Sequence, residues 1–273
     1  MTYAALPATP SVADERGIVL HNEKVNAEYR HLVVGTSALA ATAKPGQFFQ
    51  LACPQPPGET PYLRRPMSVY GADPKAHTVS FLYKVAGAGT RGLAMLRQGD
   101  RCGLMGPLGH GFWLDQAWRN IVVLGRGVGL ATLGPLAGMA QKAGVGVTAI
   151  LSARSPALVM SEEVFREAGA HVIAVTDSEG TADPANVDRL MRGLIADGLC
   201  AAMFTCGSSR LLKLLQKLAR AHDLPGQVAL EQQMACGLGM CFCCVRDFIV
   251  DGQTEHRRVC WDGPVFDLRE AVA

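Results

Sequence analysis

Two different hydrophobic patterns divide the chain. Between about residues 18 and 118, short runs with alternating apolar and polar side chains are separated by turns rich in glycine and proline. This alternation is typical of strands that bury one face, and many short strands at regular spacing indicate an antiparallel barrel or sandwich. We predict an antiparallel Greek-key β-barrel over residues 18–118.

The pattern changes after residue 119. Continuous apolar runs of strand length alternate with segments in which apolar residues recur at helical spacing. The expected strands are 120–124, 144–154, 171–176 and 201–207, and the longer expected helices are 131–143, 186–198 and 209–222. Alternation of strands and helices predicts a doubly wound parallel sheet over residues 119–228, with a ligand at the carboxyl ends of the strands.

The remaining segment, residues 229–273, is distinguished by the spacing of its cysteines. Cys236, Cys241 and Cys244 follow the pattern C-x4-C-x2-C, and Cys260 comes fifteen intervening residues later. This is the plant-type spacing for a [2Fe-2S] cluster, which needs four thiolates. Glycines in the loop allow the backbone to curl so that amide groups point at sulfur. We therefore predict a small C-terminal [2Fe-2S] domain with these four ligands.

Other uses of these cysteines are less consistent with the sequence. Zinc ribbons usually have two C-x2-C pairs, whereas these cysteines are grouped three and one. Disulfides are disfavoured because the chain has nine cysteines and no secretory signal. Cys243 is an alternative ligand, but Cys244 preserves the two-residue gap.

Composition narrows the class of protein further. The chain has 273 residues, 49% of them hydrophobic, and a net charge of +2 without a basic run, so we expect no nucleic-acid partner. Residues 1–17 contain proline and alanine but no apolar core, which predicts a disordered extension rather than a signal peptide. No apolar stretch is long enough to span a membrane, and we expect a cytoplasmic protein with reduced thiols.

Two stretches of the first segment are candidates for flavin binding. An arginine pair at 64–65 stands next to Pro66 and can hold a diphosphate bidentately, and Ser68 can reach the edge of a flavin ring. Glycines at 86–92 precede a helical run, whose N-terminus would offer amides to a phosphate. Each stretch alone is also typical of a solvated strand end or a simple turn, but their order and separation together indicate a flavin nucleotide.

The second segment has a glycine turn at Gly125, Gly127 and Gly129, which would let a pyrophosphate approach the helix N-terminus. It is not a G-x-G-x-x-G fingerprint. The fourth expected strand ends at Cys206 and Gly207, which puts a thiol at the ligand edge of the sheet or in the core. We assign no catalytic residue, because no histidine, carboxylate pair or activated nucleophile has a suitable spacing.

These three segments together predict an electron relay. Nicotinamide exchanges two electrons as hydride, an iron-sulfur cluster takes them singly, and a flavin converts between the two. We expect FAD, a [2Fe-2S] cluster and NAD(P), and a partner protein that supplies or receives the electrons.

The motifs RRPMS, FLYKVAGAGT, GPLGHGF, TCG and MACGLGMCFCC…VCWDGPVF resemble those of the electron-transfer subunits of NAD-linked (class B) dihydroorotate dehydrogenases, within the ferredoxin reductase-like superfamily. The resemblance runs from about residue 18 to the end. It implies an oxidoreductase subunit of pyrimidine biosynthesis that binds FAD and one [2Fe-2S] cluster. It also implies a heterotetramer with an FMN-containing catalytic subunit, in which electrons pass from dihydroorotate to NAD+.

The resemblance also implies roles for particular residues. The cluster ligands would be the four cysteines named above. The implied FAD contacts are Arg65, Pro66, Met67, Ser68, Leu82, Tyr83, Lys84, Gly89 and Thr90. The implied nicotinamide contacts are Gly125, Gly127, Gly129, Cys206 and Gly207.

Two arginines bear on the nucleotide. Arg126 replaces the glycine usual in this turn and can either contact a phosphate or crowd the site. Arg154, just past the second expected strand, can favour a 2′-phosphate, yet an arginine there is common in NAD users of the family. We expect NAD, with NADP as the alternative.

Three other functions remain open from the sequence. The same relay can serve a different flavoprotein dehydrogenase or reductase. The chain can be a self-sufficient NAD(P)H reductase that feeds a soluble ferredoxin or an oxygenase. It can also be a non-enzymatic iron-sulfur or zinc module, which would contain no flavin.

Overall fold

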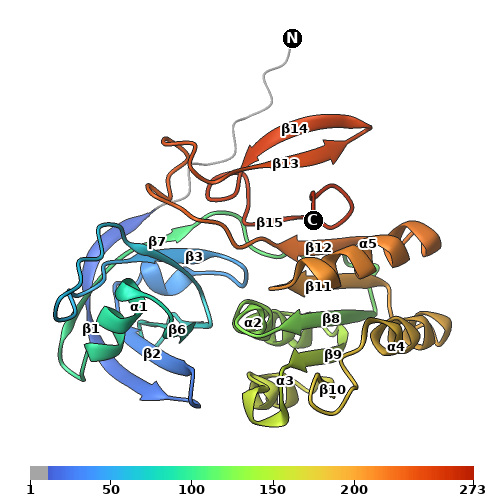
Figure 1. Ribbon diagram of the computed structural model, residues 1–273, viewed down its shortest axis with the longest axis horizontal. Helices are drawn as coiled ribbons and strands as arrows, with labels where there is room; N and C mark the ends of the chain where they lie inside the picture. Colours follow the sequence, from blue (N-terminus) through green and yellow to red (C-terminus); the bar gives the residue numbers. More distant parts are fainter. Residues whose placement is uncertain (1–11) are drawn as a thin grey trace.

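The computed structural model describes residues 12–273 and contains two large sheets, with the C-terminal segment lying across both (Figure 1). The first sheet is antiparallel, in the order β4-β3-β7-β1-β2-β6-β5. Its strands are β1 (Ala13–Lys24), β2 (Tyr29–Gly35), β3 (Phe48–Leu51), β4 (Arg65–Ser68), β5 (Gly71–Asp73), β6 (Thr78–Lys84) and β7 (Arg101–Leu108). The short helices η1 (Ala40–Thr42) and α1 (Ala88–Met95) belong to the same part of the chain.

This first sheet is curled. Its edge strands β4 and β5 are joined by Val69 and Tyr70. The N–H of Val69 donates to the carbonyl of Gln47, just before β3 (2.9 Å), and the N–H of Tyr70 donates to the carbonyl of Ser80 in β6 (2.8 Å), so the linker is bonded at both ends of the strand order. Alternate residues of the strands, such as Phe49 and Leu51 of β3, fill the interior. The predicted alternation of buried and exposed positions therefore produces the expected antiparallel β unit.

The predicted disordered extension over residues 1–17 is wrong for its last residues. Residues 1–11 lie outside the described part of the chain, but Ala13–Gly17 form the first part of β1 and pair with Gly106–Cys102 of β7. The stretch ADERG is polar, and sheet pairing uses backbone groups that do not depend on side-chain polarity. Gly17 also packs against β2, where a Cβ atom would lie 2.5 Å from the Gly35 carbonyl oxygen.

The second sheet has the order β10-β9-β8-β11-β12-β15, with the first five strands parallel and β15 antiparallel to β12. Its strands are β8 (Asn120–Arg126), β9 (Gly146–Ala153), β10 (His171–Thr176), β11 (Ala202–Cys206), β12 (Gly226–Ala229) and β15 (Val265–Asp267). Side chains of α2 and α3 pack on one face and those of α4 and α5 on the other. The helices are α2 (Gly129–Lys142), η2 (Pro156–Leu158), α3 (Glu162–Glu167), α4 (Pro184–Ala196) and α5 (Ser209–His222).

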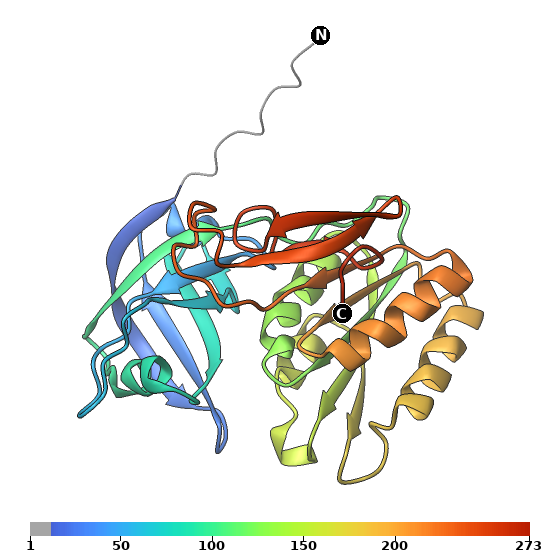
Figure 2. The same cartoon turned by 45° about the horizontal axis from the view of Figure 1, so that its top comes forward.

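The C-terminal segment joins the two sheets. After the cysteine loop it forms a hairpin of β13 (Val245–Val250) and β14 (Gln253–Arg258) that lies over the second sheet in Figure 2, and β15 then extends that sheet. His110, which follows β7, donates its N–H to the carbonyl of Gly263 at 2.6 Å. No helix of the described residues is long and apolar enough to cross a membrane.

Candidate functional site

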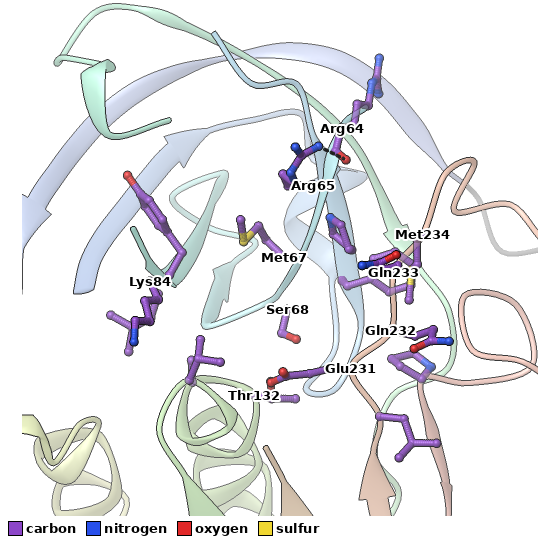
Figure 3. Close-up of a pocket in the computed structure, with 18 of the residues that line it drawn as sticks. Arg64, Arg65, Met67, Ser68, Lys84, Thr132, Glu231, Gln232, Gln233 and Met234 are labelled. Carbon is purple, nitrogen blue, oxygen red and sulfur yellow. Dashed lines mark hydrogen bonds between the residues drawn. The ribbon is translucent and has the colours of Figure 1, made fainter. Parts of the chain in front are cut away.

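A cavity of about 750 Å³ lies between the two sheets (Figure 3). It is lined by β4 and the end of β6 from the first sheet, by the first turn of α2 from the second, and by the segment that leads into the cysteine loop. Seven of the predicted FAD contacts line it, namely Arg65, Pro66, Met67, Ser68, Leu82, Tyr83 and Lys84. The structure therefore gathers these residues, distant in sequence, on one surface.

The two adjacent arginines at the start of β4 have different environments. Arg64 makes two hydrogen bonds to the carboxylate of Asp14, the shorter of 2.8 Å. Arg65 donates to the carbonyl of Leu63 at 2.5 Å, and within the described residues no carboxylate forms a salt bridge with it. Its guanidinium is therefore the available one for an anionic ligand such as a diphosphate.

The two remaining predicted FAD contacts lie beside the cavity lining, at the N-terminus of α1. The hydroxyl of Thr90 accepts hydrogen bonds from the N–H groups of Ala86 (2.9 Å) and Gly87 (3.0 Å), which fixes the turn into the helix. A Cβ atom at Gly89 would lie 2.7 Å from Nε of Arg65. The helix N-terminus and the free guanidinium are thus neighbours, as an anion site requires.

The cysteine loop brings the four predicted cluster ligands together as two neighbouring pairs. Cys236 contacts Cys241, and Cys260 contacts Cys244. Backbone N–H groups point at three of the sulfurs: Leu238 at Cys236 (3.3 Å), Gly239 at Cys260 (3.3 Å) and Cys260 at Cys244 (3.4 Å). Amides directed at sulfur are the environment that a bound thiolate needs.

The pKa values of two of these thiols differ because their surroundings differ. Desolvation would raise the pKa of Cys236, but hydrogen bonds from backbone amides and from the Cys241 thiol lower it to about 6. Burial, followed by the contact with Cys244, raises the pKa of Cys260 to about 12.

The donor set fits a two-iron cluster. In residues 12–273 no three cysteine, histidine or acidic side chains are gathered closely enough for a single metal ion. A [2Fe-2S] cluster instead divides four thiolates between two irons, two on each, which matches the two cysteine pairs.

Cys243 and Cys244 point to different places although they are adjacent. Cys244 is buried beside Cys260, whereas Cys243 is exposed and lines the large cavity. The geometry therefore favours Cys244 as the ligand. It also shows that the cysteine loop forms part of the wall of the predicted flavin site.

A second cavity of about 220 Å³ lies at the carboxyl end of β11 and includes Cys206 and Gly207. Gly129 of α2 packs directly on this strand end, where a Cβ atom would lie 2.4 Å from the Cys206 carbonyl oxygen. Contrary to the prediction, Gly125 is not at a surface that a ligand could contact, because it is buried in β8 beneath α2. The predicted nicotinamide residues thus meet at one sheet edge, with Gly125 supporting the helix.

A third cavity of about 130 Å³ at the same edge includes Gly127, Arg126 and Arg154. The guanidinium of Arg126 forms a salt bridge with Asp177 (2.5 Å) and donates to the Ser152 hydroxyl (2.9 Å). This pairing turns Arg126 toward the neighbouring strands and neutralises its charge.

Arg154 forms a salt bridge with Glu28, which comes from the first sheet. Glu28 also pairs with Lys84 at 2.9 Å, at the edge of the large cavity. Hydrogen bonds from Lys84 and then Arg154 lower the pKa of the Glu28 carboxyl.

Sequence reasoning missed Glu231, which lines both the large cavity and the second one. Figure 3 shows its side chain beside Ser68 and Thr132, and the Cys206 thiol contacts its Oε1 at 3.9 Å. Burial raises the pKa values of both Glu231 and Cys206. No motif identifies this glutamate, and its only signal in the sequence is its place five residues before Cys236.

Comparisons with known proteins find relatives over most of the chain. Residues 231–272 match the family model of the iron-sulfur cluster binding domain of dihydroorotate dehydrogenase B. The chain is 33% identical over 236 residues to the dihydroorotate dehydrogenase B (NAD(+)) electron transfer subunit of Desulforamulus reducens, covering 86% of this chain and 88% of the relative. The corresponding subunit of Shouchella clausii is 33% identical over 258 residues, covering 93% of this chain and 96% of the relative.

Solved structures show the same fold. An NADH-dependent reduced ferredoxin-NADP oxidoreductase superposes with a TM-score of 0.79 at 26% identity, over 94% of this chain and 89% of that one. A ferredoxin-NADP+ reductase from Plasmodium falciparum superposes with a TM-score of 0.61 at 11% identity, over 77% and 90% of the two chains. The fold is therefore that of the ferredoxin reductases, a β unit followed by an α/β unit.

Proposed function

The chain belongs to the family of dihydroorotate dehydrogenase B electron transfer subunits, and we propose that it relays electrons between a partner dehydrogenase and NAD+. The observation that supports this most directly is the continuity of the three sites. The large cavity shares Cys243 with the cysteine loop and Glu231 with the second cavity. A relay needs its carriers close together in a fixed order, which this continuity provides.

We assign FAD to the large cavity. Arg65 and the N-terminus of α1 would bind its diphosphate, while Ser68 and the end of β6 would line the flavin ring. When bound, the flavin exchanges electrons in pairs with nicotinamide and singly with an iron-sulfur cluster. The residues of this chain would hold and orient it.

The cysteine loop would hold the [2Fe-2S] cluster through Cys236, Cys241, Cys244 and Cys260. The amides of Leu238, Gly239 and Cys260 are already directed at sulfur and would favour the thiolate form of the ligands. With this C-terminal segment as a small [2Fe-2S] domain and the first sheet as a Greek-key barrel that would bind FAD on its outer side, we propose the full domain arrangement that the sequence predicts.

The nucleotide site favours NAD over NADP. In doubly wound sheets, the 2′ position of the adenine ribose lies near the end of the second strand, which here is the end of β9 at Ala153. Arg126 and Arg154, the two arginines of the 130 Å³ cavity there, form salt bridges with Asp177 and Glu28. A 2′-phosphate would meet the negative charge of Glu28 instead of a free guanidinium.

The partner that we propose is an FMN-containing catalytic subunit that oxidises dihydroorotate to orotate, in a heterotetramer with two copies of each subunit, for pyrimidine biosynthesis. Large apolar side chains in and beside the cysteine loop support a protein partner there. Met240 is 78% exposed and Phe242 is 63% exposed, and Trp261 is also exposed. Apolar side chains in this setting are typical of a binding surface.

Affinity purification of the tagged chain from its native cells tests this function. We expect an FMN-containing dehydrogenase to co-elute and the complex to reduce NAD+ with dihydroorotate, whereas the chain alone should not oxidise dihydroorotate. A different flavoprotein in the eluate would keep the relay but replace the substrate. Dihydroorotate oxidation by the isolated chain would contradict the subunit role.

A further inference from the structure

Gln50 is an unusual residue of β3 because its side chain is completely buried. Its neighbours Phe49 and Leu51 point into the first sheet's interior, while Phe48 belongs to the core shared with the cysteine segment. Gln50 shares that outer face with Phe48, since side chains of a strand alternate between faces. Neither Nε2 nor Oε1 of Gln50 has a hydrogen-bond partner among the described residues.

The part of the chain that meets this amide is the cysteine loop. A Cβ atom at Gly237, the residue directly after Cys236, would lie 2.8 Å from Cγ and 3.0 Å from Nε2 of Gln50. Gly237 has a φ of +72°, a backbone conformation that also brings the loop close to β3. The amide of Gln50 therefore lies against the loop at its first cysteine.

Leaving such an amide without a partner is costly. A buried polar group without a hydrogen bond destabilises the fold, a cost that an apolar side chain of the same size avoids. Apolar residues are close by, since Leu108 lies against the same glycine. The buried amide of Gln50 therefore indicates that the cysteine loop contains a hydrogen-bond acceptor once it holds its iron-sulfur group.

We propose that Nε2–H of Gln50 donates a hydrogen bond to a sulfur of the iron-sulfur group held by the cysteine loop, which makes Gln50 a positioning residue for it. This inference rests on the proposed function. A donor to sulfur stabilises the reduced, more negative form, so Gln50 raises the reduction potential. In the pairing of β3 with β4, Gln50 stands opposite Pro66, which lines the large cavity. Strand β3 therefore lies next to the proposed FAD site as well as the cysteine loop.

The substitution Gln50→Met tests this role because it keeps the length of the side chain and removes the donor. In the purified holoprotein we expect unchanged FAD and iron content and a reduction potential, measured by redox titration with electron paramagnetic resonance, that shifts to more negative values. Gln98→Met, at an exposed position after α1, is the matched control and should leave the potential unchanged. An unchanged potential in the Gln50 variant with an intact cluster would overturn the proposal.

A measurement on the wild-type protein covers the case in which the variant loses its cluster. With glutamine labelled by ¹⁵N at the side-chain amide, the reduced cluster should show a ¹⁵N coupling in its pulsed paramagnetic resonance spectrum. A cluster without this coupling would reject the role of Gln50. A wild-type protein without any [2Fe-2S] signal would instead contradict the proposed function itself.

Discussion

At the scale of single residues, adjacent side chains in this protein have separate roles because the backbone directs them to different partners. Arg64 and Arg65 show this most clearly. Asp14 of β1 neutralises the first, while the second faces the large cavity beside α1. The sequence RRP gives no sign of which arginine is free.

Arg65→Ala should weaken FAD binding by roughly tenfold to a hundredfold, because a charge-assisted hydrogen bond contributes about 1.5–3 kcal/mol. The dissociation constant can be measured by flavin fluorescence during titration of the apoprotein. Arg64→Ala is the control and should change FAD affinity little, since its guanidinium is paired with Asp14. Equal losses in the two variants would contradict the distinction.

Cys243 and Cys244 form a second adjacent pair with separate surroundings. Cys260→Ser should abolish the [2Fe-2S] absorbance and retain FAD, because Cys260 pairs with buried Cys244 and lies away from the cavity lining. Cys243→Ser should keep the cluster, since Cys243 is exposed in the cavity wall. Iron and flavin analysis of both variants provides the check, and cluster loss in Cys243→Ser alone would reverse the assignment.

At the scale of elements, the start of α2 is positioned by contact with the end of β11. Gly129 begins the helix and lies against the carbonyl of Cys206, so the glycine turn and the strand end form one surface. Both α2 and β11 are needed to form this surface. A side chain at Gly129 would push the helix away from the strand.

Gly129→Ala should destabilise the protein by about 1–3 kcal/mol through overpacking and should slow reduction of the flavin by NADH, with FAD retained. Stopped-flow reduction and denaturant unfolding measure the two effects. Gly138→Ala on the same helix is the control, because a Cβ atom there meets no atom within 4 Å. It should be neutral or slightly stabilising, since alanine favours helix. Normal NADH reduction in Gly129→Ala would contradict the packing argument.

At the scale of the whole molecule, contacts between the two sheets define the sites. Glu28 of the first sheet's β1–β2 turn reaches Arg154 after β9 and Lys84 at the cavity edge. The C-terminal segment adds a second connection, because it contacts the first sheet at His110 and extends the second through β15. The proposed carriers therefore lie between parts that are held together.

Glu28→Gln should reduce the preference for NADH over NADPH by about tenfold, because it frees Arg154 for a 2′-phosphate and removes a repulsive charge. The ratio of kcat/KM values for the two nucleotides, measured with an artificial electron acceptor, checks this. Glu59→Gln, which removes a similar arginine pair beside α1, should leave the ratio unchanged. An unchanged ratio in Glu28→Gln would show that this carboxylate does not set nucleotide preference.

The sequence by itself determined the β class of the first unit, the α/β class of the second and most of the strands and helices that build them. The alternation of apolar and polar residues in strands, the succession of strands and helices, and the cysteine spacing are patterns among neighbouring residues. Each follows from the local geometry of a strand, a helix or a cluster loop. The family resemblance followed from the same motifs and is confirmed by relatives that are about one-third identical over most of the chain. Local pattern was insufficient at Ala13–Gly17, where a polar run is a strand because β7 pairs with its backbone.

Only the tertiary structure decided which residues meet. In the pairs Glu28 with Arg154, Glu231 with Cys206, and Gln50 with Gly237, the two residues are far apart in the sequence and share no motif. Such contacts depend on how two sheets and a C-terminal segment pack. Packing is set by the shape of whole surfaces, whereas a pattern in the sequence reports only the local period of burial.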